Sequence, residues 1–204
     1  DTIFSTGCWF EGELTINFAK YFSKTRPGSA FVDIGANIGN HSHCMQLLAN
    51  PSKIVMLEPV PCNLELARLN NPQAIILKAA CSDSLGVADF IMTPDDYGIG
   101  RLKSKTYQDD LICGRNNLSI EVLKVRLDDI SCGEIGALKI DVEGAEFECL
   151  KGAKCSISKY RPLIWLEIHN GSPRKALIFD FLDSFGYCQI AGDGGINYIF
   201  DIID

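Results

Sequence analysis

A carboxylate followed by a glycine-spaced turn is the first feature of the chain that could do chemistry. The stretch Ala30-Phe-Val-Asp-Ile-Gly-Ala-Asn-Ile-Gly-Asn-His-Ser42 places Asp33 at the end of a short β-branched run, which predicts a buried strand of a parallel sheet. In open α/β sheets, ligands bind outside the carboxyl ends of the strands, where glycines let a ligand approach the backbone. The loop Asp33, Gly35, Asn37, Gly39 lacks the middle glycine of the Gly-x-Gly-x-x-Gly dinucleotide loops. It predicts a binding turn for another small molecule.

Two further predicted strands end in polar residues that suit an adenosyl group. The segment 53–59 reads as a buried strand ending at Glu58, and a carboxylate there can accept two hydrogen bonds from a ribose diol. The segment 74–83 reads as a third strand that ends in Ser82 and Asp83, which suit an adenine edge. The three strand ends together predict one adenosyl-type ligand.

A later motif, Leu138-Lys-Ile-Asp-Val-Glu-Gly-Ala-Glu146, narrows the comparison. With the segments above, it resembles the FkbM family of class I S-adenosylmethionine-dependent methyltransferases, over a stretch from about Gly7 to the C-terminus. The resemblance implies S-adenosylmethionine as cofactor and O-methylation of a hydroxyl on a sugar or other small-molecule acceptor. It implies that the methionine moiety is held by Asp33, Gly35, Asn37 and Gly39. It also implies that Glu58 holds the ribose and that Ser82 and Asp83 hold the adenine.

Methyl transfer to a hydroxyl needs in-line placement, a dry pocket and a group that removes the acceptor's proton. His169 ends the predicted strand 161–169 and can be neutral at physiological pH, so it is the candidate base, with Asp141 and Glu143 of the neighbouring strand as catalytic partners. A structural role for this histidine stays open. So does a divalent-ion site of Asp141, His169 and Asn170 that would lower the pKa of a substrate diol. We favour the metal-free base, because one imidazole and few carboxylates make a poor magnesium site.

Two other functional classes remain open from the sequence. A catalytically silent protein of this fold, acting as a cofactor- or partner-binding module, would keep the glycine loop as scaffold. A nicotinamide-dependent oxidoreductase would share the strand-end acid, but the missing middle glycine and a closing hairpin count against it. Cofactor titration would separate the silent protein from an enzyme.

The elements that must position these residues alternate along one predicted domain, residues 1–204. We expect an α/β fold, a single Rossmann-like class I methyltransferase domain with a mostly parallel seven-stranded sheet and helices on both faces. A leading helical segment, 1–28, carries apolar residues at helical spacing. Later predicted helices cover about 41–50, 61–71, the stretch after Val142 with Glu143 in its first turn, and the stretch after Ser172-Pro173. The segments 187–191 and 197–203 predict a C-terminal antiparallel hairpin.

The alternation fails after the third strand, where a β/loop insertion is expected. Residues 87–92 and 120–127 read as strands, and the polar stretch 95–118 between them reads as a structureless loop and possible lid. Tyr97, Arg101, Tyr107 and Arg115 in this loop could face a hydroxylated substrate.

Composition excludes several other classes. The 204 residues carry 19 basic and 26 acidic side chains, which gives a net charge of −7, and no cluster of Lys or Arg is present that could bind a polyanion. The expected partner is therefore a small-molecule or glycosidic acceptor and not nucleic acid. No apolar run is long enough for a membrane span, and a signal peptide is lacking, so we expect a cytoplasmic protein, although a chain without an initiator Met could have been trimmed. Nine cysteines without a Cys-x-x-Cys pair favour buried free thiols, with Cys44, Cys81 and Cys149 inside predicted elements.

Overall fold

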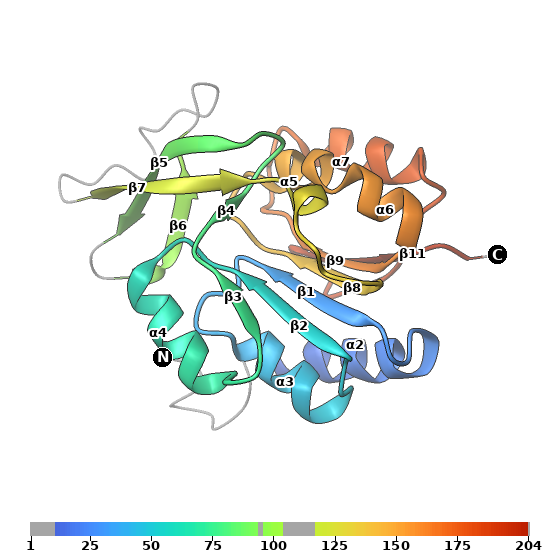
Figure 1. Ribbon diagram of the computed structural model, residues 1–204. Helices are drawn as coiled ribbons and strands as arrows, with labels where there is room; N and C mark the ends of the chain where they lie inside the picture. The colour runs from blue at the N-terminus through green and yellow to red at the C-terminus, as the bar shows by residue number, and fades with distance from the viewer. Residues whose placement is uncertain (1–10, 94–95, 104–116, 204) are drawn as a thin grey trace.

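The computed structural model describes residues 11–93, 96–103 and 117–203 and is built on a seven-stranded sheet (Figure 1). The strand order is β10-β11-β9-β8-β1-β2-β3. All pairs within β9-β8-β1-β2-β3 are parallel, whereas β11 runs antiparallel to both β9 and β10. The strands are β1 Ala30–Ile34, β2 Lys53–Leu57, β3 Ile75–Leu77, β8 Ile135–Ile140, β9 Leu163–Glu167, β10 Cys188–Gly192 and β11 Asn197–Asp201. The predicted mostly parallel sheet and its closing hairpin are confirmed.

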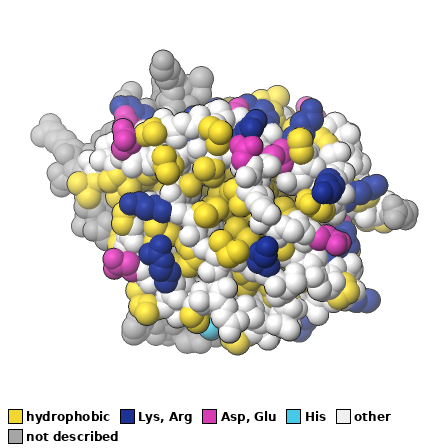
Figure 2. Space-filling model, in the orientation of Figure 1, with side chains coloured by type: hydrophobic (Ala, Val, Ile, Leu, Met, Phe, Trp, Pro, Cys, Tyr) yellow, Lys and Arg dark blue, Asp and Glu magenta, His cyan; other side chains and the backbone are white. Residues whose placement is uncertain are grey.

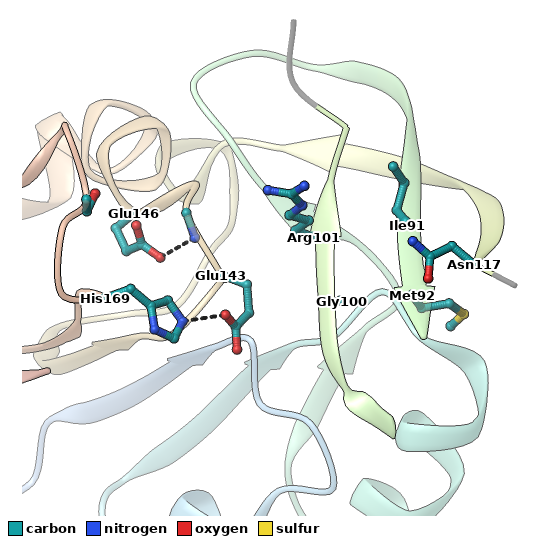
Figure 3. A pocket seen from close by; sticks show the side chains of 10 residues that line it. Ile91, Met92, Gly100, Arg101, Asn117, Glu143, Glu146 and His169 are labelled. Atoms are coloured by element: carbon teal, nitrogen blue, oxygen red, sulfur yellow. Dashed lines mark hydrogen bonds and ion pairs between the residues drawn. The ribbon is translucent and has the colours of Figure 1, made fainter. Parts of the chain in front are cut away.

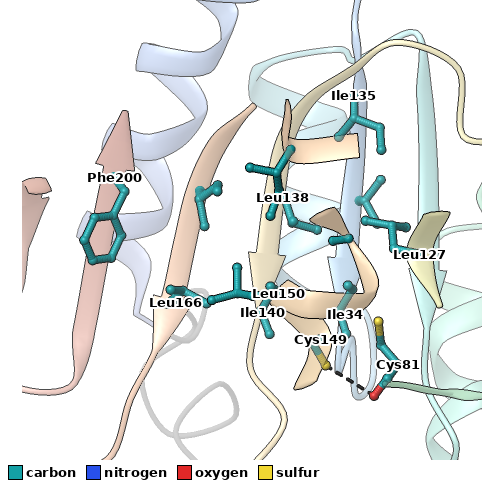
Figure 4. Packing of buried hydrophobic residues seen from close by; sticks show 14 of the residues in the cluster. Ile34, Cys81, Leu127, Ile135, Leu138, Ile140, Cys149, Leu150, Leu166 and Phe200 are labelled. Atoms are coloured by element: carbon teal, nitrogen blue, oxygen red, sulfur yellow. Dashed lines mark hydrogen bonds between the residues drawn. The ribbon is translucent and has the colours of Figure 1, made fainter. Parts of the chain in front are cut away.

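Helices cover both faces of this sheet, because its central strands carry buried, mostly apolar residues on both sides. Strand β1 turns Phe31 toward Phe18 and Phe22 of α2, and Val32 toward the cluster that contains Leu150 of α5. The first face carries α2 Gly12–Thr25, α3 Asn40–Leu48 and α4 Pro61–Asn70, and the second carries α5 Glu146–Gly152, α6 Lys154–Tyr160 and α7 Lys175–Asp183. Figure 4 shows part of the apolar cluster on the second face, the one covered by α5, α6 and α7.

A second sheet of four strands, in the order β4-β7-β5-β6, replaces a helix between β3 and β8. Its strands are β4 Ala80–Cys81, β5 Gly86–Thr93, β6 Asp96–Leu102 and β7 Leu118–Val125, and the 3-10 helix η2 Leu127–Asp129 leads back to the main sheet. The expected insertion is therefore present. The expectation of one structureless loop over 95–118 is wrong for residues 96–102, which pair antiparallel with β5. Tyr107 and Arg115 lie outside the described residues.

The third predicted strand, 74–83, is also corrected. Its first part forms β3 at the edge of the main sheet, and the chain then leaves that sheet, so that Ala80 and Cys81 pair with β7 in the second sheet. Ser82 and Asp83 therefore follow β4 and do not end a strand of the main sheet.

Some helix boundaries differ from the sequence expectation. The first described helix begins at Gly12, and the part of the predicted leading helix before residue 11 lies outside the described residues. The helix expected directly after Val142 begins only at Glu146, because Glu143 adopts a left-handed φ of 54° and Gly144 one of 102°.

The burial of the cysteines, the surface charge and the length of the helices can be compared with the expectations from the sequence. Cys44, Cys81 and Cys149 are buried free thiols, as predicted, and Cys149 donates a hydrogen bond to the Cys81 carbonyl (Figure 4). The prediction of burial is wrong for the free thiols of Cys62, Cys155 and Cys188, which are exposed. On the face drawn in Figure 2, apolar side chains gather near the middle, while Lys and Arg side chains are scattered among acidic ones. Within the described part of the chain, no helix is long and apolar enough to cross a bilayer.

Candidate active site

The glycine loop after β1 is held tightly against the end of the sheet. Gly35 and Gly39 have φ values of +78° and +75°, and Asn37 has a φ of 51°, so three of its residues are left-handed. Gly35 and Ala36 both donate backbone hydrogen bonds to the Leu57 carbonyl of β2. A Cβ at Gly35 would lie 1.7 Å from the carbonyl oxygen of Asp141. Only glycine fits there, and the loops after β1 and β8 therefore touch.

Asp33 lies fully buried in β1, at the start of this loop. Its Oδ2 accepts a hydrogen bond of 2.6 Å from the Ser42 hydroxyl in α3, which ties the strand end to the helix that follows the loop. Its Oδ1 has no hydrogen-bond partner within the described part of the chain. A buried carboxylate oxygen without a partner is rare and indicates a place where a ligand or water donates.

Glu58, directly after β2, connects the glycine loop to α4. Its Oε2 accepts a hydrogen bond of 2.9 Å from the Asn37 backbone N–H, and its Oε1 accepts from the Val60 N–H at 2.9 Å and from Asn63 Nδ2 at 3.3 Å. Burial raises the pKa of this carboxyl, against the lowering effect of those hydrogen bonds. A carboxylate offers about four lone-pair sites, so three contacts leave room for about one more donor.

Ser82 and Asp83 lie beside α5. The buried Ser82 carbonyl packs so closely on Gly152 that a Cβ there would lie 2.0 Å from it. The Asp83 carboxylate accepts a hydrogen bond of 2.5 Å from Lys151 Nζ, and this contact lowers the pKa of Asp83. Asp83 is thus ion-paired with a helix, which the sequence did not indicate.

A fully buried lysine organises the end of β8. Lys139 Nζ donates a hydrogen bond of 2.9 Å to Asp141 Oδ2 and lies 5.7 Å from the ring centre of Trp165. In the strand register, Lys139 stands opposite Asp33 on one side and Trp165 on the other. Asp141, predicted as a catalytic partner of the histidine, is therefore held by this lysine. Sequence patterning did not single out Lys139, because its pairing depends on strand order.

His169, after β9, pairs with Glu143 from the loop after β8 (Figure 3). Its Nε2 donates to Glu143 Oε2 at 2.5 Å, and the two side chains are 50% and 24% exposed. Burial of the ring lowers its pKa, but the hydrogen bond and charge of Glu143, with Glu167 and Glu146 nearby, outweigh this effect, so the pKa of His169 is raised. Glu143 holds this position with a left-handed backbone, at a φ of 54°.

This pair lines a pocket of about 270 Å³ between the second sheet and the loops after β8 and β9 (Figure 3). Glu146 also lines it and is buried; its carboxylate accepts a hydrogen bond of 2.7 Å from the Gly144 N–H, and burial raises its pKa to about 7. Arg101 of β6 faces the pocket from the other wall. The sequence placed Glu146 only in a motif and Arg101 only in a loop, because neither burial nor the β5–β6 pairing is visible in a local pattern.

Two residues of the alternative metal site have hydrogen-bond partners outside that site. Asp141 bonds to Lys139, His169 bonds to Glu143, and Asn170 is exposed. Among residues 11–93, 96–103 and 117–203, no three His, Cys, Asp or Glu side chains are grouped as metal ligands.

Comparisons with known proteins agree on a family and a fold. Residues 33–188 match a family model described as a methyltransferase FkbM domain. The crystal structure of a methyltransferase FkbM from Methylobacillus flagellatus KT is similar with a TM-score of 0.58 and 16% identity, covering 91% of this chain and 50% of that protein. This chain thus spans half the length of that relative. None of the curated proteins compared matches the chain.

Two other solved structures share the same fold at low identity. A precorrin-6y methyltransferase from Geobacter metallireducens GS-15 has a TM-score of 0.52 and 13% identity, covering 94% of this chain and 88% of that one. A ribosomal protein methylase from Lactobacillus delbrueckii subsp. bulgaricus has a TM-score of 0.55 and 9% identity, covering 98% and 83%.

Proposed function

The chain belongs to the FkbM family of methyltransferases, whose cofactor is S-adenosylmethionine, and on that premise we propose that it methylates a hydroxyl of a sugar or other small-molecule acceptor. The observation that carries this proposal is a pocket lined by the His169–Glu143 pair. The pocket adjoins the glycine loop, because Gly35 of that loop packs on the loop that leads to Glu143. In this proposal, one wall of the pocket supplies the group that takes up the proton, and the adjoining edge of the sheet binds the cofactor.

The residues at the ends of β1 and β2 fit the cofactor. We assign Asp33, Gly35, Asn37 and Gly39 to the methionine moiety and Glu58 to the ribose. Asp33 Oδ1, buried without a partner in the described part of the chain, suits a donor such as the ammonium group, and Glu58 has capacity for about one more hydroxyl without rearrangement. When bound, the cofactor supplies an electrophilic methyl group on a sulfonium.

Ser82 and Asp83 remain our proposal for the adenine side. Asp83 Oδ2 accepts from Lys151 Nζ and the carboxylate also accepts from Ser84, so a remaining lone pair is what could accept from an exocyclic amine. The close packing of Ser82 on Gly152 of α5 supports a fixed position for this strand end.

The acceptor hydroxyl must lose its proton as its oxygen attacks, and His169 is our candidate base. Glu143 accepts a hydrogen bond from His169 Nε2, so this pairing places the proton of the neutral imidazole on Nε2. The lone pair on Nδ1 is then available to take the proton of the substrate hydroxyl. Glu143 also stabilises the imidazolium that forms. Asp141 is bonded to Lys139, and we assign it to fixing the loop after β8 on Gly35.

An acceptor screen with labelled S-adenosylmethionine tests this function. Saccharides, phenols, peptides and lipids would be offered to the wild-type chain and to Glu143→Ala. We expect the label on a hydroxyl oxygen of one saccharide or other small hydroxylated compound, with transfer strongly reduced in Glu143→Ala. Label on nitrogen or carbon, or equal transfer by both proteins, would contradict the proposal.

A further inference from the structure

The two walls of the pocket differ in charge (Figure 3). Arg101 comes from β6 on one side, while Glu143 and His169, from the loops after β8 and β9, and Glu146, the first residue of α5, lie on the other. Arg101 is only 8% exposed, a degree of burial that is unusual for arginine. A small ligand that fills this space meets a guanidinium at one end and carboxylates with an imidazole at the other.

We propose, resting on the function proposed above, that the acceptor is a hydroxylated ring bearing an anionic group, a carboxylate or a phosphate, which Arg101 binds. The planar guanidinium presents five N–H donors in a fork that matches both groups. It can therefore bind such an anion and still keep contacts with the chain.

The charges also fix which way the acceptor enters. An anionic group placed beside Glu143 and Glu146 would face like charge, whereas the same group beside Arg101 faces the opposite charge. The hydroxylated end then points to His169, whose neutral form accepts the proton. The buried carboxyl of Glu146, next to it, can hydrogen-bond a second hydroxyl in either protonation state.

The size and the apolar lining of the pocket fit a single ring. Its volume of about 270 Å³ lies just below the range of about 300–1,000 Å³ that is usual for drug-sized ligands. Ile91 of β5, which stands opposite Arg101 in the strand register, forms an apolar part of the wall. Such a surface suits the C–H face of a sugar ring, so a uronate or a sugar phosphate combines all the features that the lining offers.

Equilibrium binding tests the preference without knowledge of the natural acceptor. Calorimetry would compare methyl β-D-glucuronide, glucose 6-phosphate and the neutral methyl β-D-glucoside, each titrated into the protein saturated with S-adenosylhomocysteine. We expect at least one anionic probe to bind ten or more times more tightly than the neutral glycoside, and the two anionic arms to identify the preferred anion. Equal affinities, or binding by none of the probes, would overturn the inference.

Two arginine variants assign the preference to a residue. Arg101→Gln should remove the anionic preference, while Arg68→Gln, the same change at an exposed position of α4, should keep it. A preference that survives in Arg101→Gln would overturn the role of Arg101, and unchanged affinity for S-adenosylhomocysteine checks that the variant is folded. If that variant does not fold, the wild-type comparison still decides the preference.

The first titration separates this inference from the proposed function. If S-adenosylhomocysteine itself does not bind the wild-type protein, the proposed function fails and this inference fails with it. If S-adenosylhomocysteine binds and the three probes show no anionic preference, only this inference is overturned.

Discussion

At the scale of single residues, the role of proton acceptor that we propose for His169 gives a kinetic prediction. His169→Ala should lower kcat by about 10²–10⁴-fold without changing the affinity for S-adenosylmethionine, because the imidazole acts only on the acceptor's proton. His43→Ala is the matched control, since His43 lies on α3 and contacts the Asn70 carbonyl. Wild-type turnover in His169→Ala would exclude the base.

The pH dependence of the same step follows from the raised pKa of His169. In the proposed mechanism the base is the neutral imidazole, so kcat should rise as pH increases above the ordinary value of 6.5 and level off beyond the raised pKa. Glu143→Gln removes the main charge that raises this pKa, so the rise should move to lower pH while the plateau rate falls. A profile with the same midpoint in both proteins would show that the Glu143 charge does not tune the base.

Lys139 gives a stability prediction at the same scale. Burial alone lowers its pKa, but Asp141 and Asp33 raise it overall, so the ion pair contributes stability below the ordinary lysine pKa and loses it as pH rises through the raised value. Lys139→Met should reduce the free energy of unfolding at pH 7 by about 3 kcal/mol, because it leaves the buried Asp33 and the partly exposed Asp141 without their cation. Urea unfolding measures this, with the exposed Lys154→Met as control. Equal midpoints in the two variants would contradict the role given to Lys139.

At the scale of elements, the contact between the loops after β1 and β8 depends on Gly35. Gly35→Ala combines a left-handed φ of +78° with a Cβ placed 1.7 Å from the Asp141 carbonyl oxygen, whereas Gly133→Ala has a similar φ of +82° and no atom within 4 Å. The control should cost about 1–2 kcal/mol for the backbone conformation alone. Gly35→Ala should cost more in unfolding free energy and should also weaken binding of S-adenosylmethionine. Equal effects of the two variants would mean that the loops do not need this close approach.

Element boundaries also show what a local pattern can predict. Residues 30–34 and 53–57 were predictable strands because they are short, β-branched and buried on both faces. Residues 74–83 carry a similar apolar pattern, but only Ile75–Leu77 pairs in the main sheet, and local periodicity does not encode which sheet a residue joins. The strand Asp96–Leu102 was not predicted, because Gly98 and Gly100 are residues typical of loops and interrupt the apolar pattern of a strand. Its pairing with β5 is a contact that the local sequence does not show.

At the scale of the whole molecule, the sequence predicted the class of fold and the turn between β1 and α3 better than it predicted the pocket. Asp33, Gly35 and Glu58 belong to strand ends whose meeting at one edge follows from parallel topology. The links Lys139–Asp141 and His169–Glu143, and Arg101 across the pocket, depend on strand order, on the left-handed turn at Glu143 and on the second sheet. None of these is a local property of the chain.

Calorimetric titration of S-adenosylmethionine tests the central claim, that the edge formed by the ends of β1 and β2 binds this cofactor. We predict that the wild-type protein binds it and that Glu58→Gln binds at least tenfold more weakly, since a charge-assisted hydrogen bond contributes about 1.5–3 kcal/mol. Glu65→Gln, the same change at an exposed position of α4, should match the wild type. No binding by the folded wild-type protein, or equal affinity in Glu58→Gln, would contradict the claim.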